Sequence, residues 1–151
     1  MAVTIRQAVP SDAGAIARLS RDDLGYDYPA EQTERKLQAV LHSSRDRVYV
    51  AEADGSVVGY IHANDYDLLY APSMKNILGI AVSERYRREG VGKRLIGAVE
   101  DWARQTGAAG IRLVSGAQRT GAHAFYRSCG FGSEREQIHF QKVLKQEAKA
   151  P

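Results

Sequence analysis

The sequence predicts a mixed α/β fold in one domain of 151 residues. Segments with the alternation of a β-strand are interspersed with segments whose apolar residues recur at helical spacing. The chain has no internal repeat, low-complexity stretch or linker that would separate two domains. We therefore expect a single domain over residues 1–151, with residues 145–151 as a frayed tail.

The N-terminal third predicts one strand and two helices. Residues 3–9 alternate as a half-buried strand does, and the Pro-Ser-Asp signal at residues 10–12 starts a short amphipathic helix. Residues 22–29 combine acidic residues, glycine and proline, so they break that helix and predict a loop. Residues 31–41 then predict a second helix, because their apolar residues gather on one face.

The middle of the chain predicts a hairpin and a third strand beside it. Residues 48–53 and 57–63 predict paired strands, because the Asp-Gly dipeptide between them is a strong hairpin turn signal. Residues 64–72 predict a loop or a ragged strand end. Residues 75–82 predict the strand that follows that loop.

The C-terminal part predicts two helices and two strands. A long helix ends at Gly107, and its apolar face follows the spacing i, i+4, i+8, i+11 at Val91, Leu95, Val99 and Trp102. Residues 111–115 predict a short buried strand, residues 122–129 a helix capped by Gly130, and residues 138–144 a last strand.

The segment 77–92 carries the clearest functional signal. An apolar strand pattern ends in a short basic loop, two glycines follow, and a helix then begins. Backbone N–H groups at a helix start and the positive end of the helix dipole favour an anion there. Gly90 and Gly92 have no Cβ, so the backbone can approach a ligand closely. We therefore expect a ligand that carries phosphate.

Two familiar phosphate loops do not fit. In a P-loop the Gly-Lys pair is followed by Ser or Thr, whereas here Arg94 follows it, and Arg87 stands where the first glycine belongs. A dinucleotide-binding loop needs a third glycine, where this chain has Leu95.

A third pattern fits. Residues 87–92 match [QR]-x-x-G-x-[GA], and residues 122–131 resemble A-x-x-F-Y-x-x-x-G-F. Both motifs occur, in this order, in the GNAT superfamily of N-acetyltransferases, in which the first one binds the pyrophosphate of coenzyme A. Residues 113–115 stand where that family has its fifth strand, and the resemblance covers residues 3–144.

The resemblance implies a fold and a reaction. The expected fold is a mixed, mostly antiparallel central sheet of about six to seven strands flanked by about four helices. The expected reaction is direct transfer of acetyl from acetyl-CoA, the cosubstrate, to a primary amine, without a covalent acyl-enzyme. The remaining alternative is a non-catalytic acyl-CoA-binding sensor or partner module.

The resemblance also implies which residues bind the cofactor. Main-chain groups of a splayed strand would bind the thioester and the pantetheine arm, the basic loop would bind the pyrophosphate, and the second motif would complete the site. The expected set is Ile80, Ala81, Val82, Arg87, Arg88, Glu89, Gly90, Val91, Gly92, Lys93, Arg119, Phe125 and Tyr126. Two positions depart from the family: Glu89 stands where Arg or Lys is common, and Arg119 where Asn is frequent.

The chemistry requires that the amine lose a proton and that the leaving thiolate gain one. By resemblance Tyr126 is the catalytic acid, since a phenol stays protonated at neutral pH and can donate to a thiolate. The base stays open between ordered water and five side chains, Glu52, His62, Asp65, Asp67 and His123. No metal is expected, because the four histidines and one cysteine lack ligand spacing.

The resemblance also implies that the acceptor contacts two loops, whose acidic and aromatic residues could bind a cationic amine by ion pairing and cation–π contact. These residues are Tyr26, Tyr28, Glu31, Asp65 and Tyr66. Aminoglycoside, polyamine, amino acid, peptide N-terminus and protein lysine all stay open as the small-molecule or peptide acceptor.

The composition limits the partners. The net charge of +3 is too small to predict nucleic-acid binding, and no apolar run reaches the length of a membrane span, so we expect neither partner. The N-terminus lacks a signal-peptide pattern, and the single cysteine suits a reducing compartment, so a cytoplasmic location is expected. A homodimer is common among GNAT enzymes and is a further expectation from the resemblance.

Overall fold

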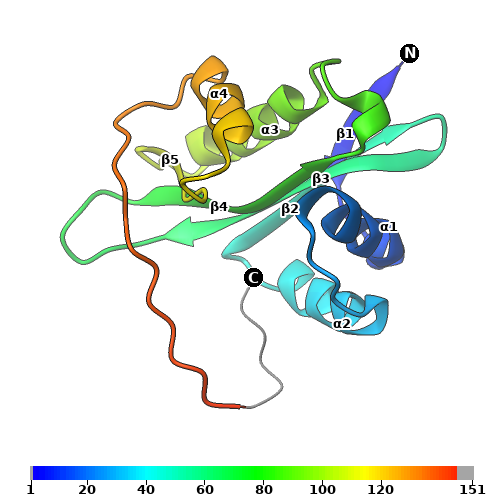
Figure 1. Ribbon diagram of the computed structural model, residues 1–151, viewed down its shortest axis with the longest axis horizontal. Coiled ribbons are helices and arrows are strands. Elements are labelled where there is room, and N and C mark those ends of the chain that lie inside the picture. Colours follow the sequence, from blue (N-terminus) through cyan, green and yellow to red (C-terminus); the bar gives the residue numbers. More distant parts are fainter. Residues whose placement is uncertain (1, 146–151) are drawn as a thin grey trace. The chain divides into compact units, whose positions relative to one another are not determined.

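The computed structural model describes residues 2–145 and is drawn in Figure 1. The chain divides into two compact units, one that ends at Val114 and one that begins at Ser115. The first unit contains the sheet and three α-helices, and the second contains one α-helix.

The first unit is built on a five-stranded sheet in the order β1-β2-β3-β4-β5. The first four strands form an antiparallel meander, and β5 pairs parallel to β4. The strands are β1 Val3–Gln7, β2 Asp46–Ala53, β3 Ser56–Tyr66, β4 Met74–Val82 and β5 Gly110–Leu113. The predicted class, a mixed and mostly antiparallel sheet, is confirmed.

Local sequence explains the turn between β2 and β3. Asp54 and Gly55 both have positive φ, 52° and 78°, which a two-residue type I′ hairpin requires. A bulge interrupts β4 opposite His62 and Ala63, because Leu78 has no register partner on β3. The hairpin was therefore predicted correctly from its turn, whereas nothing in the sequence indicated the bulge.

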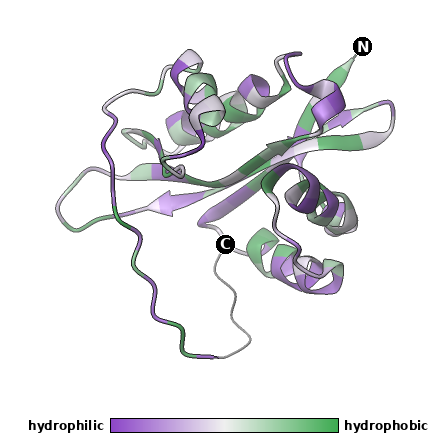
Figure 2. Cartoon of the chain, viewed as in Figure 1, coloured by the Kyte–Doolittle hydropathy of each residue, from purple (hydrophilic) through white to green (hydrophobic). Residues whose placement is uncertain are grey.

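Helices cover both faces of the sheet in the first unit (Figure 1). Helices α1 (Ala13–Leu19) and α2 (Ala30–Leu41) lie on one face, and α3 (Val91–Gln105) lies on the other. Both α2 and α3 show hydrophilic and hydrophobic turns in Figure 2, as amphipathic helices do. Under α1 and α2 the core includes Ala8, Ile16, Leu19, Leu37, Val48, Val50, Tyr60 and Ala81. Against the other face α3 buries Val91, Leu95, Ile96, Val99, Trp102 and Ala103.

The second unit contains α4 (Thr120–Ser128) and a long segment without regular structure after it. The helix ends at Gly130, whose φ of 96° lets Phe131 N–H bond to the carbonyl of Tyr126 at 3.1 Å. The following segment alternates hydrophilic and hydrophobic stretches in Figure 2.

The predicted strand at 138–144 is wrong. Within the described residues this segment pairs with no strand, and its apolar side chains are exposed, Phe140 at 85% and Leu144 at 87%. A β-strand needs a partner for its backbone groups, and alternation alone does not supply one. The sheet therefore has five strands and not six to seven.

Smaller differences concern the ends of elements. Strand β3 continues to Tyr66, where a loop from residue 64 was predicted, and the predicted loop at 22–29 begins with a helical turn, η2, over Ser20–Leu24. The single domain over 1–151 stays a prediction, and the tail predicted at 145–151 lies outside the described residues apart from Lys145.

Candidate cofactor and acceptor site

The loop after β4 has the backbone that the sequence predicts for anion binding. Strand β4 ends at Val82, a short 3-10 turn occupies Glu84–Tyr86, and α3 begins at Val91 after Gly90. Gly90 has φ 78°, and a Cβ there would meet nothing within 4 Å, so its backbone conformation and not lack of space requires glycine. Arg88 also has positive φ, 67°, which is uncommon for a residue with a side chain and is typical of functional loops.

The N-terminus of α3 has no side-chain cap. The first helical hydrogen bond runs from Arg94 N–H to the carbonyl of Gly90 at 3.1 Å. The N–H groups of Val91, Gly92 and Lys93 therefore have no partner within the helix, which leaves them available to an anion. Arg88 and Lys93 are exposed and form no ion pair within residues 2–145. Phosphate groups fit this arrangement.

Arg87 has a partner that the sequence did not indicate. Its guanidinium forms an ion pair with Asp23 of η2, and its Nε lies 3.4 Å from the carbonyl oxygen of Val82. The other oxygen of Asp23 accepts the N–H of Val82 at 3.3 Å. Asp23 and Arg87 thus join η2 to the end of β4. Glu89 is exposed, so its carboxylate reaches solvent.

The outer edge of β4 lacks a strand partner at the predicted cofactor positions. The ladder between β4 and β5 covers only Met74–Ile77, so from Leu78 onward no described strand pairs with β4 on this side. Ser83 N–H bonds to β3, and alternation then directs the N–H groups of Ile80 and Val82 away from β3. Ala81 lies between them and is buried.

The second motif forms α4 of the second unit. Tyr126 is half-buried, and its ring lies 5.5 Å from the ring of Phe125 and 5.9 Å from that of Phe131. Arg119 precedes the first helical residue, is exposed, and donates its backbone N–H to Gly116 at 3.0 Å. The motif therefore builds one helix end with an aromatic cluster.

Three of the predicted acceptor residues lie together in sequence and are exposed. Tyr26 and Tyr28 follow η2 and are 44% and 42% exposed, and Glu31 lies in the first turn of α2. Lys36 lies 5.5 Å from the centre of the Tyr28 ring, so this aromatic face already contacts a cation.

Asp65 and Tyr66 lie on opposite faces of β3, because successive residues of a strand alternate. Tyr66 lies on the face of α1 and α2, where the guanidinium of Arg112 is 4.1 Å from its ring centre. Asp65 lies on the α3 face and accepts a hydrogen bond of 2.5 Å from Lys75. The structure therefore does not bring these two predicted acceptor residues together on one face of the sheet.

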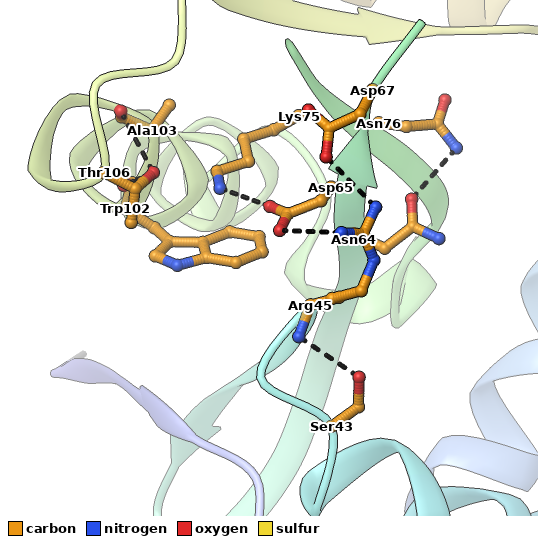
Figure 3. Close-up of polar contacts among 10 residues, drawn as sticks. All are labelled: Ser43, Arg45, Asn64, Asp65, Asp67, Lys75, Asn76, Trp102, Ala103 and Thr106. Carbon is orange, nitrogen blue, oxygen red and sulfur yellow. Dashed lines mark hydrogen bonds and ion pairs between the residues drawn. The ribbon is translucent and has the colours of Figure 1, made fainter. Parts of the chain in front are cut away.

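Figure 3 shows the cluster around Asp65. Lys75 is 4% exposed, and its Nζ lies 3.8 Å from the centre of the Trp102 ring. Arg45 lies 4.0 Å from Asp65 and 3.1 Å from Asp67. Hydrogen bonds from Ser73 and Arg45 lower the pKa of Asp67. The cluster lies at the C-terminal end of α3, roughly 20 Å from the phosphate loop at 1.5 Å per helical residue.

Comparison with known proteins decides the family. Residues 14–131 match the model of the acetyltransferase (GNAT) family. The chain belongs to this family. Its relatives include an aminoglycoside N(6′)-acetyltransferase type 1 of Stenotrophomonas maltophilia, 33% identical over 97% of both chains. An uncharacterised N-acetyltransferase of Bacillus subtilis is 29% identical over 91% of this chain and 95% of its own length.

A solved structure with the GNAT fold supports the architecture. An aminoglycoside N-acetyltransferase in complex with CoA superimposes with a TM-score of 0.84 over 93% of this chain and 95% of its own, at 21% identity. This GNAT chain is thus an acyltransferase that uses acetyl-CoA as cosubstrate to acetylate an amine. The non-catalytic alternative is not favoured.

No helix within residues 2–145 is long and apolar enough to cross a membrane. Across the same residues no group of three or more His, Cys, Asp or Glu side chains could hold a metal ion.

Proposed function

We propose that this GNAT enzyme acetylates a primary amine of a small cationic acceptor of the aminoglycoside kind. The observation that carries the proposal is the match to an aminoglycoside N(6′)-acetyltransferase over nearly the full length of both chains. The exposed tyrosines and acidic residues after η2 agree with it, since they suit an ammonium-rich ligand.

Different residues of the chain would bind the cofactor and donate the proton. The uncapped start of α3, with Arg88 and Lys93, binds the pyrophosphate, and the outward N–H of Ile80 in β4 binds the acyl and pantetheine region, since the N–H of Val82 is donated to Asp23. Acetyl-CoA supplies an activated thioester when bound. Tyr126 donates a proton to the departing thiolate. Arg119, Phe125 and Glu89 belong to the proposed cofactor site, with Glu89 contributing its main chain.

Turnover with a panel of amines tests the acceptor. The panel contains an aminoglycoside, spermidine, free amino acids and a peptide, with thiol release as the signal and calorimetric titration of acetyl-CoA beforehand. We expect acetyl-CoA binding and the highest kcat/KM with the aminoglycoside. Turnover of neutral or acidic acceptors alone would overturn the acceptor class, and binding without any turnover would favour the non-catalytic alternative.

Arg87→Ala is expected to raise the Kd of acetyl-CoA about tenfold or more, because it removes a cation from the cradle and leaves Asp23 unpaired beside it, and charge-assisted hydrogen bonds contribute roughly 1.5–3 kcal/mol. Calorimetric titration measures the change. Arg85→Ala is the matched control, since Arg85 is exposed on the same loop and stacks on Tyr86. An unchanged Kd for Arg87→Ala would mean that Arg87 takes no part in binding the cofactor.

We also propose a homodimer and a cytoplasmic location. The exposed apolar side chains of residues 138–144 suit a contact with a second copy, because exposed apolar patches mark protein–protein interaction sites. The single cysteine, Cys129, suits a reducing compartment. Sedimentation should show a dimer that Phe140→Asp converts to monomer, and a monomeric wild type would contradict this.

A further inference from the structure

A polar pair lies on the sheet face that α1 and α2 cover. Strand β3 places His62 on the same face as Tyr60, two residues earlier, and Tyr60 belongs to the core under these helices. Nε2 of His62 lies 2.8 Å from Oδ1 of Asp46 at the start of β2. The side chains are 25% and 18% exposed, so the pair is held by packing and still reaches solvent.

The chemistry of this pair fixes the tautomer of the ring. An ionised carboxylate only accepts hydrogen bonds, so Nε2 of His62 carries the proton. The lone pair of the neutral ring then resides on Nδ1. Within residues 2–145, Nδ1 forms no hydrogen bond. A histidine oriented in this way by a carboxylate is arranged to accept a proton.

The strand next to His62 has no side chain at the position that pairs with it. His62 pairs in register with Gly79 of β4, which has no side chain. A Cβ at Gly79 would lie 3.6 Å from the hydroxyl of Tyr60, so the missing side chain faces this same surface. The next residue, Ile80, directs its N–H to the unpaired outer edge of β4. His62 is thus about one strand spacing, roughly 4.8 Å, from the strand proposed to bind the acyl group.

The four other side chains considered as a base are occupied elsewhere. Glu52 bonds to Arg6 at 2.8 Å, and Asp65 bonds to Lys75 on the opposite face. Asp67 is held by Arg45. His123 belongs to the second unit, where its Nε2 lies 2.9 Å from the carbonyl oxygen of Gly116.

We propose that His62 is the proton acceptor of the acetyl transfer and that Asp46 is its positioning residue, an inference that rests on the proposed function. The amine nitrogen forms a bond to the acyl carbon while the carbon–sulfur bond breaks. The proton lost by nitrogen passes to Nδ1 of His62, and the departing sulfur takes up one proton from the general acid or from solvent. Atoms and charges balance without a further reactant.

The groups around His62 matter for assigning the pH dependence of the reaction to this residue. On its face β4 contributes the uncharged Asn76 and Gly79, and α2 contributes apolar Leu37, Val40 and Leu41. The charged or titratable groups of this face are Arg6 from β1, Asp12 before α1, Asp46 and Glu52 from β2, Tyr60 and Tyr66 from β3, Arg112 from β5, and Asp23 and Tyr26 from η2 and the loop after it. Burial raises the pKa of Tyr60, so the hydroxyl of Tyr60 stays protonated at neutral pH.

The test uses His62→Gln and Asp46→Asn, with His42→Gln as the matched control, since His42 is exposed at the end of α2. For His62→Gln we expect kcat/KM to fall about 100-fold at neutral pH with the Kd of acetyl-CoA unchanged, as for loss of a general base. For the wild type we expect kcat/KM to fall toward acid pH. This fall should be absent in His62→Gln, and added imidazole should restore part of the rate of that variant. Asp46→Asn should lower kcat with little change in KM.

Three outcomes separate the two proposals. A wild type that acetylates amines while His62→Gln keeps its rate and its acid limb would overturn the role of His62 alone. A wild type without turnover would overturn the proposed function. If thermal melting shows that His62→Gln does not fold, the pH profile of the nearly isosteric Asp46→Asn variant decides whether the pair is catalytic. A merely structural pair would leave the pH profile of Asp46→Asn unchanged.

Discussion

Asp65→Ala is expected to lower the free energy of unfolding by about 3 kcal/mol, because removing one partner of a buried ion pair leaves the other charge uncompensated. That other charge is the ammonium of Lys75, 4% exposed and packed on Trp102. Arg45 cannot replace the lost carboxylate, since it is a cation as well. Urea denaturation followed by Trp102 fluorescence measures the change.

The matched control for Asp65→Ala is Lys75→Met, which removes the buried charge and keeps most of the side-chain volume. It should cost less than Asp65→Ala, since Asp65 is 25% exposed and keeps Arg45 nearby. The double variant should be more stable than Asp65→Ala alone, because no unpaired ammonium remains buried. Equal costs for the two single variants would show that burial of the Lys75 charge contributes nothing.

Tyr126→Phe is expected to lower kcat about 100-fold while the Kd of acetyl-CoA stays within twofold, since a positioned general acid contributes roughly 10²–10⁴-fold. The substitution removes one oxygen and keeps the ring contacts with Phe125 and Phe131. Steady-state thiol release and calorimetry separate the two quantities.

Tyr49→Phe is the control for Tyr126→Phe, because it removes a hydroxyl from the α3 face of β2. It should leave kcat near the wild-type value. A normal turnover rate for Tyr126→Phe would remove the acid role from this residue and leave solvent as the source of the proton.

The sequence predicted correctly those elements that depend on residues close together in the chain. The hairpin follows from Asp54 and Gly55, and the phosphate loop follows from Gly90 and the helix pattern after it. The predicted strand at 138–144 was wrong, because apolar residues in a short segment do not supply the partner that a strand needs.

The contacts that sequence could not predict join distant residues. Asp23 and Arg87 are 64 positions apart, and the ion pair between them depends on how η2 meets β4. The burial of Lys75 depends on Trp102 of α3 covering it, although lysine is ordinarily exposed. The pairing of His62 with Asp46 depends on the register of β2 and β3.

The strand order has a consequence for folding kinetics. Strands β1 to β4 neighbour one another in chain order, although a long connection with α1 and α2 separates β1 from β2. Pairing β4 with β5 also closes a loop, which contains the whole of α3. Closing this loop costs chain entropy before any contact between the strands offsets it. The phosphate loop lies within this crossover. Binding of acetyl-CoA at the proposed loop would therefore stabilise a nonlocal part of the fold, by RT ln(1 + [L]/Kd), and acetyl-CoA would act as a folding ligand as well as a substrate.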